Sequence, residues 1–567
     1  MCGISGVIGN NLNEDVLSKM IATQKHRGPD SSGKYVKNGV CLGHNRLSII
    51  DLTDAANQPF IDKTERYILV FNGEIYNYLE LKSELEDYNF KTNSDTEVLL
   101  AAYIKWGKEC LHRLNGMFSF AIWDSTEQKL FAARDRFGVK PFNYHFSKDT
   151  FYFASEIKTI HAAGVNKKPN EKVWANYFVY GSYGMPNETF WEEIHQLPGG
   201  HTLEFENNQI KIEKWYVFEE EIKKHEQKKS YEEVKSEYIA LLKDSIKIRF
   251  RADVPVGFNV SGGLDSSALL AFVNLLDEDK SKINAYTFYT NDERYDELPW
   301  VEEMISLTKN PLKKVLLNVD EIEDLSEKIN SFQDEPFGGI PTLAYSKIFE
   351  KAREDGVLVL LDGQGMDEQW AGYDYYVKKS GSLIQGVNKS PFRKNVLSEY
   401  FLNLAEKPNY PKPFKDDLLN LQYRDLFYTK VPRALRFNDR ISMAHSTELR
   451  EPFLDYRLVE LAFSQPLEYK IKDGVQKSML REIVSEYLND SISYAPKRPL
   501  QTPQREWLNN ELRRNVDNSI KKIKKSTFRN WFNLNELDLE WKKYEDGNID
   551  SSFHIWQWVN FELLITE

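Results

Sequence analysis

The second residue of the chain is a cysteine, set in the stretch MCGISGVIG. If Met1 is removed, Cys2 gains a free α-amine with a pKa of about 7.7 to 8, low enough to act as a base for its own thiol. One residue would then hold both a nucleophile and a base. The alternative is structural, because Ile4, Val7 and Ile8 could pack in a buried strand in which Cys2 is only a small apolar side chain.

Three further motifs carry groups that suit one substrate of such a thiol. Arg46 in RLSIID has a planar guanidinium that matches a carboxylate. In NGEIYN, Asn72 and the N–H of Gly73 could donate to an oxyanion, and Asp95 in SDTE could hold an ammonium. A ligand with an α-carboxylate, an α-ammonium and an amide attacked by a thiol is glutamine. Each group also has a structural interpretation, as a surface ion pair, a hairpin turn or a helix cap.

A different chemistry is indicated by VSGGLDSSALL at 260–270. A strand ends, two glycines allow a ligand close to the backbone, and a helix begins with Asp265, Ser266 and Ser267 in its first turn. Free N–H groups and the helix dipole make such a place an anion site, although an ordinary capped turn has the same composition. No lysine follows the glycines, so this is not the GxxxxGK[ST] loop. An aspartate inside an anion site makes sense if a divalent cation bridges it to phosphate.

A second loop of the same kind lies in GVLVLLDGQGMDEQWAGY at 356–373, where a strand is again followed by glycines and acidic residues. If the two strands are neighbours in one sheet, Asp367 would lie close enough to Asp265 to share a magnesium ion with it. The motif DGQGMDE alone is weak.

The elements that must position these groups fall into two patterns. The first 215 residues or so alternate short β-runs with two amphipathic helices, which predicts an α+β layered domain. The predicted strands include 66–74, 117–124, 129–135 and 150–156, and the predicted helices are 78–87 and 95–107. The charged stretch 218–230 is predicted to be a solvated linker, which gives domains at 1–217 and 231–567.

Beyond the linker, helices and strands alternate, which predicts a parallel sheet covered on both faces with ligands at the carboxyl ends of its strands. After about residue 380 the pattern is mostly helical. The predicted helices are 231–250, 266–276, 298–308 and 342–355, and the predicted strands are 254–260, 284–290, 313–319 and 356–363.

Composition limits the class of protein. A chain of 567 residues is expected to form at least two domains. Its net charge of -12 is spread along the chain without a basic stripe, which argues against nucleic acid as a partner. Three cysteines fit neither a disulfide framework nor a zinc site, and there is no leader or long apolar run, so we expect a cytoplasmic protein that does not bind membranes.

The motifs together resemble a known family. MCGISGVIG, HRGPDSSG, RLSIID, NGEIYN and SDTE resemble the glutaminase domain of the N-terminal-nucleophile amidotransferases, and SGGLDSS resembles the pyrophosphate loop of ATP pyrophosphatases. With DGQGMDE, SMAHSTELREPFLD and GVQKSMLRE, the whole chain is similar to the glutamine-dependent asparagine synthetase family. The resemblance implies an αββα first domain of the N-terminal-nucleophile hydrolase type. It implies a second domain like the adenine nucleotide alpha hydrolases, with a helical C-terminal region.

For the first domain, the resemblance implies that Cys2 attacks glutamine, Asn72 and Gly73 form the oxyanion hole, and Arg46, Glu74 and Asp95 bind the amino acid end. For the second, it implies that ATP and Mg²⁺ are used, that Asp265 and Asp367 bind the metal, and that Lys477 contacts the phosphates. The implied ATP-binding set is Val260, Ser261, Gly262, Gly263, Asp265, Ser266, Ser267, Phe288, Asp362 and Gly363. Ammonia would pass between the sites through a dry tunnel, and the family often forms homodimers.

The expected reaction converts a carboxylate to an acyl adenylate, releasing pyrophosphate, and then amidates it, with aspartate as the expected acceptor. Two features depart from the family pattern. Many members have glutamate where this chain has Gln364, which cannot take a proton from attacking ammonia. Where aspartate-binding members carry serine or threonine, this chain has Gly338, Gly339 and Ile340. These could give a more open pocket for another acid, such as a sugar uronate for a surface polysaccharide.

Other classes fit less well. A stand-alone glutaminase or a sugar-phosphate amidotransferase would not need SGGLDSS. A β-lactam-forming relative or an inactive binding protein would be expected to lose some of Cys2, Arg46, Asn72 and Asp95, and all are present.

Overall fold

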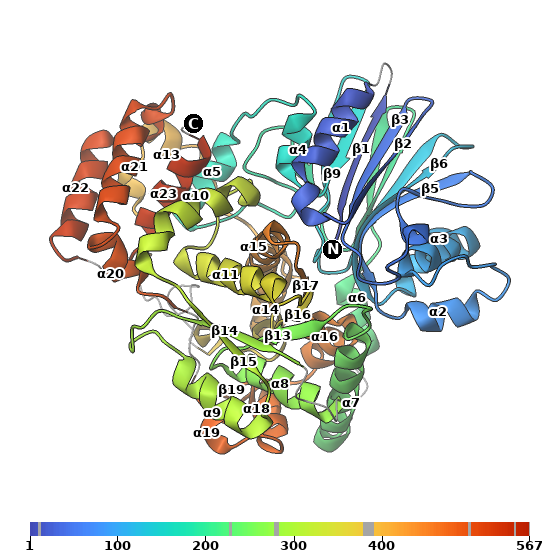
Figure 1. The fold of residues 1–567 in the computed structure, drawn as a ribbon. Helices are drawn as coiled ribbons and strands as arrows, with labels where there is room; N and C mark the ends of the chain where they lie inside the picture. The colour runs from blue at the N-terminus through green and yellow to red at the C-terminus, as the bar shows by residue number, and fades with distance from the viewer. Residues whose placement is uncertain are drawn as a thin grey trace.

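The computed structural model describes residues 1–9, 13–225, 229–276, 283–377, 390–496, 501–548 and 551–565. Two antiparallel sheets lie near the N-terminus and one parallel sheet lies in the second half of the chain. Figure 1 shows these two parts side by side, with the start of the chain where they meet. The two-domain prediction, with a layered α+β part followed by an α/β part, is confirmed.

The first sheet has the order β10-β8-β9-β1-β3-β2 and the second the order β12-β11-β7-β6-β5-β4. The strands of the first are β1 (Gly3–Gly9), β2 (Ser31–Lys37), β3 (Val40–Arg46), β8 (Asn143–Ser147), β9 (Thr150–Ala154) and β10 (His195–Gln196). Those of the second are β4 (Phe60–Ile61), β5 (Tyr67–Ile75), β6 (Gly116–Asp124), β7 (Lys129–Arg134), β11 (His201–Glu206) and β12 (Gln209–Lys214).

The alternation of side chains along the strands builds four layers. Ile4 and Ile8 of β1 pack with Ile68 and Val70 of β5 in a core between the sheets, whereas Val7 packs with the helices outside. The first sheet is covered by α1 (Glu14–Thr23) and α4 (Ile157–Ala162), and the second by α2 (Tyr78–Glu84) and α3 (Asp95–Trp106). This is the predicted αββα arrangement, in which β1 and β5 bring Cys2 and Asn72 together.

The parallel sheet has the order β15-β14-β13-β16-β17. Its strands are β13 (Val256–Asn259), β14 (Ala285–Tyr289), β15 (Leu312–Leu316), β16 (Val359–Leu361) and β17 (Glu448–Arg450). The covering helices include α7 (Tyr231–Arg249), α8 (Leu264–Leu276) and α9 (Leu298–Thr308) in one core, and α10 (Ile322–Gln333) and α11 (Ile340–Glu354) in another. Because β13 and β16 are neighbours, the condition for bringing Asp265 and Asp367 together is met.

The rest of the second part is helical, as predicted. Its helices are α12 (Met366–Gln369), α13 (Glu399–Leu402), α14 (Asp417–Phe427), α15 (Lys430–Ala444), α16 (Tyr456–Phe463), α17 (Leu467–Lys470), α18 (Ser478–Ser485), α19 (Asp490–Ser493), α20 (Gln504–Asn509), α21 (Arg513–Lys525), α22 (Leu534–Glu545) and α23 (Phe553–Ile565), with a hairpin of β18 (Ile471–Lys472) and β19 (Val475–Gln476). Short 3₁₀ helices occur at Lys25–Arg27, Asp54–Ala56, Gly107–His112, Val319–Glu321, Asp374–Tyr376, Lys394–Val396, Pro452–Leu454 and Arg529–Trp531.

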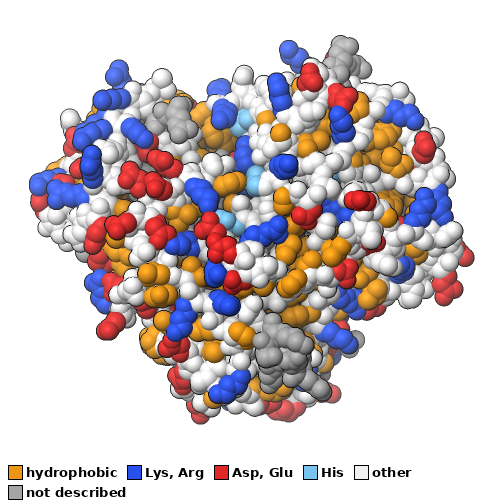
Figure 2. All heavy atoms as spheres, in the orientation of Figure 1, with side chains coloured by type: hydrophobic (Ala, Val, Ile, Leu, Met, Phe, Trp, Pro, Cys, Tyr) orange, Lys and Arg blue, Asp and Glu red, His pale blue; other side chains and the backbone are white. Residues whose placement is uncertain are grey.

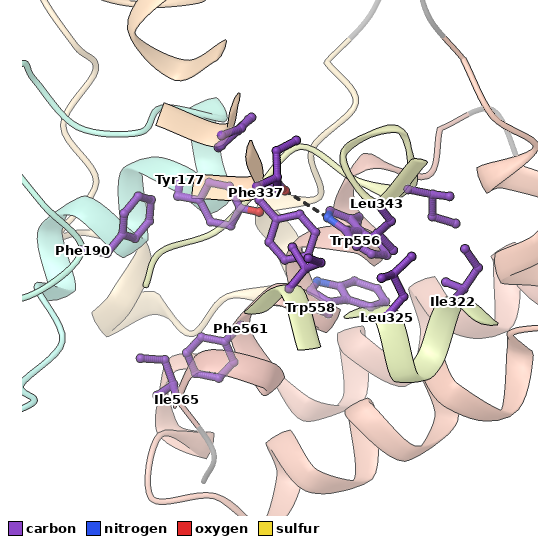
Figure 3. Packing of buried hydrophobic residues seen from close by; sticks show 14 of the residues in the cluster. Tyr177, Phe190, Ile322, Leu325, Phe337, Leu343, Trp556, Trp558, Phe561 and Ile565 are labelled. Atoms are coloured by element: carbon purple, nitrogen blue, oxygen red, sulfur yellow. Dashed lines mark hydrogen bonds between the residues drawn. The ribbon is translucent and has the colours of Figure 1, made fainter. Parts of the chain in front are cut away.

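The C-terminal helix joins both parts of the chain. Figure 3 shows aromatic residues of α23 packed against α10, α11 and α5 (Glu171–Tyr180), a helix between strands β9 and β10 of the first sheet. Trp556 Nε1 donates to Phe337 O at 3.0 Å, which pairs the indole N–H of a buried ring.

The predicted solvated linker is wrong over its first half. Phe218–Lys224 forms helix α6, and Phe218 and Ile222, four residues apart on one face, are buried. Residues 226–228 of this stretch lie outside the described part of the chain.

Acidic and basic side chains are interspersed over the face drawn in Figure 2. Among the described residues, no helix combines the length and apolarity that crossing a membrane requires.

Candidate active sites

Cys2 lies at the start of β1, where the sandwich meets the second part of the chain (Figure 1). Its backbone N–H donates to Asn72 Oδ1 at 3.2 Å, and its thiol lies 3.9 Å from Leu47 O. Burial raises the pKa of the Cys2 thiol, although the chain's α-ammonium and Arg46 act in the opposite direction. The thiol therefore needs a base close by before it can act as a nucleophile.

Asn72 provides a hydrogen-bond donor next to this thiol. Its side chain is fully buried, and within the described part of the chain its Nδ2 has no hydrogen-bond partner. A buried N–H₂ group without a partner is costly, so its presence next to Cys2 points to an oxygen acceptor brought by a ligand. Gly73 follows, and a Cβ there would lie only 2.2 Å from Met117 O, so the close approach of β5 and β6 requires glycine.

Two buried carboxylates predicted to bind the amino acid end of the substrate, Glu74 and Asp95, interact with each other near Cys2. Glu74 Oε2 lies 3.4 Å from Arg450 Nη2, and burial raises the pKa of Glu74 well above its usual range, with Glu448 and Asp95 adding to the shift. Asp95, at the start of α3, accepts the Ile75 N–H at 2.9 Å. Burial raises the pKa of Asp95 to about 6.

Arg46 is buried and held by its own loop. Its Nη1 donates to Thr53 O at 2.7 Å and to Asn57 Oδ1 at 2.9 Å, and its Nη2 donates to Ile50 O and Asp51 O. The structure places Arg46 close enough for its charge to act on the Cys2 thiol, and the four contacts with its own loop are made by Nη1 and Nη2.

The predicted phosphate loop joins β13 to α8. Ser266 Oγ lies 3.0 Å from Ser261 Oγ and donates to Ser261 O at 2.8 Å, which ties the two ends of the loop together. Ser267 Oγ donates to Gly263 O at 2.8 Å. The Gly262 N–H donates to Glu297 Oε2 at 2.9 Å, so this backbone group already faces an anionic oxygen.

Other predicted nucleotide residues line a pocket beside the loop. Val260, Ser261 and Phe288 are among its walls, together with Asn259 and Glu297.

Lys477 joins the two acidic loops. Its Nζ lies 2.5 and 2.7 Å from the two carboxylate oxygens of Asp265 and 2.6 Å from Asp367 Oδ1. Burial alone would lower the pKa of Lys477. The charges of Asp265 and Asp367 have the larger combined effect, so the pKa of Lys477 is raised. Lys477 has a left-handed backbone (φ 54°), which is uncommon outside glycine and marks a constrained position. A Cβ on Gly372 would lie 2.0 Å from Asp367 Oδ1, so only glycine leaves room for this cluster.

Asp362 and Gly363 follow β16 directly. Asp362 Oδ1 accepts the Gly363 N–H at 2.7 Å, and Gly363 lies against Asp265 of the first loop. Burial raises the pKa of Asp362 to about 6. Hydrogen bonds from the Gly363 backbone and from the side chains of Gln364 and Asn259 act in the opposite direction and lower this pKa. Gln364 therefore contributes a hydrogen bond to the site and no charge.

Models of two families match this chain: a glutamine amidotransferase domain over residues 1–216 and asparagine synthase over residues 237–566. The second match covers more than half of the 567 residues. The chain belongs to the asparagine synthase family.

Named relatives match over most of their length. The glutamine-hydrolysing asparagine synthetase 3 of Bacillus subtilis is 31% identical, over 88% of this chain and 86% of the relative. Asparagine synthetase 1 of the same organism is 29% identical, over 92% and 90%. Amidase chry2 of Gibberella zeae is 26% identical, over 100% and 97%. This member of the asparagine synthase family is a glutamine-hydrolysing, ATP-dependent amidotransferase.

The glycines expected to open the acceptor pocket of this family member do not do so at their own positions. A Cβ on Gly338 would lie 3.0 Å from the Phe437 ring, and one on Gly339 only 2.4 Å from Gln504 Oε1. Ile340 is fully buried. Side chains distant in sequence therefore occupy the space beside both glycines, and a more open acceptor pocket stays a prediction.

Arg27 was not predicted as a site residue, yet its side chain donates a hydrogen bond to the backbone of Cys2. Arg27 is fully buried, its Nε donates to Cys2 O at 3.0 Å, and its Nη1 lies 3.0 Å from Glu156 and 2.9 Å from Asp439. Asp439 belongs to α15, so this ion pair also joins the two parts of the chain. HRGPDSSG was recognised as a motif, but its partners lie 129 and 412 residues away.

We expect Arg27→Met to lower the free energy of unfolding by about 3–5 kcal/mol, because it removes a buried cation that two buried carboxylates share. Glu156 keeps Lys158 at 2.7 Å, whereas Asp439 keeps Lys140 only at 4.0 Å. The control is Arg66→Met, which breaks a partly exposed ion pair with Asp124 and is expected to cost less than about 1 kcal/mol. Urea titrations of the two variants measure the difference. Equal losses would show that the Arg27 network contributes no more than a surface pair.

Proposed function

We propose that the protein makes asparagine from aspartate: it converts the aspartate side-chain carboxylate to an acyl adenylate with ATP and amidates it with ammonia released from glutamine. Residues 1–217 would be the glutaminase domain and 231–567 the synthetase domain, with 218–230 connecting them. The family match supports the reaction type, and the two groups of side chains described above supply the chemistry.

In the glutaminase site, the thiol of Cys2 attacks the side-chain carbonyl of glutamine. Asn72 Nδ2, which has no hydrogen-bond partner in the described part of the chain, and the Gly73 N–H would stabilise the oxyanion. Ammonia leaves, and water hydrolyses the thioester. Glu74 and Asp95 would hold the α-ammonium of glutamine, and Arg46 its carboxylate.

The base for this step follows from the position of the chain start. With Met1 in place, its α-ammonium lies 3.3 Å from Glu448 Oε2 and both side chains are buried. Removal of Met1 would leave Cys2 with its own α-amine at the atom that now contacts Asn72 Oδ1. An amine at this position can take the thiol proton. Without such a base the thiol keeps its proton, because burial raises the pKa of Cys2.

In the synthetase site, the loop from Ser261 to Ser267 would hold the pyrophosphate part of ATP, with Phe288 and Val260 beside the nucleoside. The Gly262 N–H, which now binds a carboxylate oxygen, would bind a phosphate oxygen. Lys477 would neutralise charge on the phosphates as the acceptor carboxylate attacks.

The residues around Lys477 also fit a magnesium ion. Two carboxylates that share one ammonium present several oxygens to a single cation, and Mg²⁺ is commonly held by one or two carboxylates plus substrate phosphates. Asp265 and Asp367 would hold it. When bound, Mg²⁺ neutralises phosphate charge and makes pyrophosphate a better leaving group.

The observation that carries the proposal is a pocket lined by residues from both parts of the chain. It is lined by Met117 and Tyr76 from the sandwich and by Arg249, Glu451 and Leu454 from the second part of the chain. Met117 pairs with Glu74 across β5 and β6, so the pocket borders the glutaminase site. A pocket shared by both parts of the chain suits the transfer of ammonia away from bulk water.

An assay of ATP conversion to AMP and pyrophosphate over a panel of acids tests the acceptor. We expect aspartate to be activated and nucleotide sugars with a uronic acid to be inactive. Activation of a uronic acid alone would favour the second candidate, amidation of a sugar uronate; Gln364, which departs from the family's glutamate, is the reason for testing it. Release of ADP would contradict the mechanism itself.

A further inference from the structure

Amidation of an acyl adenylate releases a proton, and the residue that accepts it has to be identified. Ammonia bonds to the carbonyl carbon through its lone pair, AMP leaves with the electrons of the C–O bond, and the nitrogen must lose one proton to become a neutral amide. Gln364 beside Asp362 is an amide and has no useful basicity. The base must therefore be another group at this end of the sheet.

Glu451 lies at the required edge of the sheet. β16 and β17 are parallel, with Leu361 opposite Arg450, and the Asp362 N–H donates to Arg450 O at 2.9 Å. Glu451 comes directly after Arg450, and Asp362 comes directly after Leu361. The two acidic residues therefore lie at the same end of neighbouring strands. The carboxyl ends of parallel strands are where ligands bind in such sheets.

The carboxyl group of Glu451 is buried without a complete set of partners. The residue is 4% exposed, and in the described part of the chain its Oε2 has no hydrogen-bond partner. Burial raises the pKa of Glu451, and the charge of Asp362 adds to the shift, while Lys140, the Gln364 backbone and Arg249 oppose it. A buried acceptor atom without a donor is rare in a folded protein and indicates a bound group.

Glu451 also lines the pocket that borders the glutaminase site. Met117, whose carbonyl packs against Gly73, is in the same pocket, as are Tyr76 and Leu454. Ammonia that entered this pocket from Cys2 would meet the Glu451 carboxylate, which lies near enough to Asp362 to feel its charge.

We propose that Glu451 is the catalytic residue that accepts the proton of ammonia as it attacks the acyl adenylate. This rests on the proposed function. The C–N bond forms, the C–O bond to AMP breaks, and one proton passes from nitrogen to the Glu451 carboxylate, which later returns it to water. Its position in a buried pocket makes the carboxylate a stronger base than an exposed glutamate.

The test compares Glu451→Gln with the wild-type enzyme, using ammonia in place of glutamine. The variant should form amide about 10²- to 10⁴-fold more slowly, as expected for loss of a general base. It should keep acid-dependent exchange of pyrophosphate into ATP, because adenylation needs no proton acceptor at this position. The control is Glu460→Gln, another buried glutamate, which accepts a hydrogen bond from Tyr216 and is not among the residues that line the pocket; it should retain amide formation.

Hydroxylamine, a less basic nucleophile, separates proton transfer from a structural role. The intermediate that it forms loses its proton to water more readily. The ratio of the wild-type rate to the Glu451→Gln rate should therefore be at least about tenfold smaller with hydroxylamine than with ammonia. Equal deficits with both nucleophiles, or joint loss of exchange and amidation, would overturn the assignment of Glu451. If the wild-type enzyme activates no acid at all, the proposed function fails instead, which is a distinct outcome.

Discussion

Cys2→Ala is expected to abolish amide synthesis from glutamine and to leave synthesis from added ammonia intact. Loss of the nucleophile should lower glutaminase activity by at least about 10³-fold. The predicted synthetase residues lie on the part of the chain that holds the parallel sheet, so ammonia added in solution should still be used there. Amide formation with each nitrogen source, measured on the same preparation, gives the ratio.

The matched control for this prediction is Cys41→Ala. Cys41 is a free, buried cysteine on β3, opposite Val7 of β1, and its thiol is not part of the site. We expect this variant to keep both activities. An electrophilic glutamine analogue should label the Cys41→Ala variant covalently and should not label the Cys2→Ala variant. Glutaminase activity that survives in Cys2→Ala would contradict the assignment of the nucleophile.

Asp265→Asn has the second large effect that we expect. It keeps the size of the side chain but removes one of the two carboxylates around Lys477. Acid-dependent formation of AMP and pyrophosphate should fall by about 10²-fold or more, because charge at the phosphates is no longer balanced. Hydrolysis of glutamine should continue, since Cys2 and its partners are untouched.

Asp292→Asn serves as the control for Asp265→Asn. Asp292 follows the neighbouring strand β14 and pairs with the exposed Arg294, so its loss should change AMP formation less than twofold. If the two variants formed AMP at equal rates, the phosphate loop would be wrongly assigned.

Sequence patterns predicted those parts of the fold that depend on local periodicity. The alternation after residue 231 predicted β13, α8, β14 and α9, and the predicted helix at 298–308 has the observed bounds. The glycine loops at the ends of β13 and β16 could be placed at one sheet edge because parallel strands share their direction. The strand order then brought Asp265 and Asp367 to Lys477.

Contacts between distant segments could not be predicted in the same way. Strand β17 has only three residues, Glu448–Arg450, too few for any periodicity to show. Its residues meet Met1 and Glu74, more than 370 positions away, and a single sequence holds no signal for such pairs. Glu451 was inside a recognised motif, yet only the register of β16 and β17 shows that it faces Asp362. The burial of Phe218 and Ile222 was hidden by the charges around them.

A heavy-oxygen label in the acceptor carboxylate gives the most direct test of amidation through an adenylate. The carboxylate that attacks ATP passes one of its oxygen atoms to AMP when ammonia displaces the nucleotide. Mass spectrometry of AMP formed during glutamine-dependent synthesis should therefore find one labelled oxygen in its phosphate for each amide made. Unlabelled AMP, or label in inorganic phosphate formed alongside ADP, would contradict the acyl adenylate.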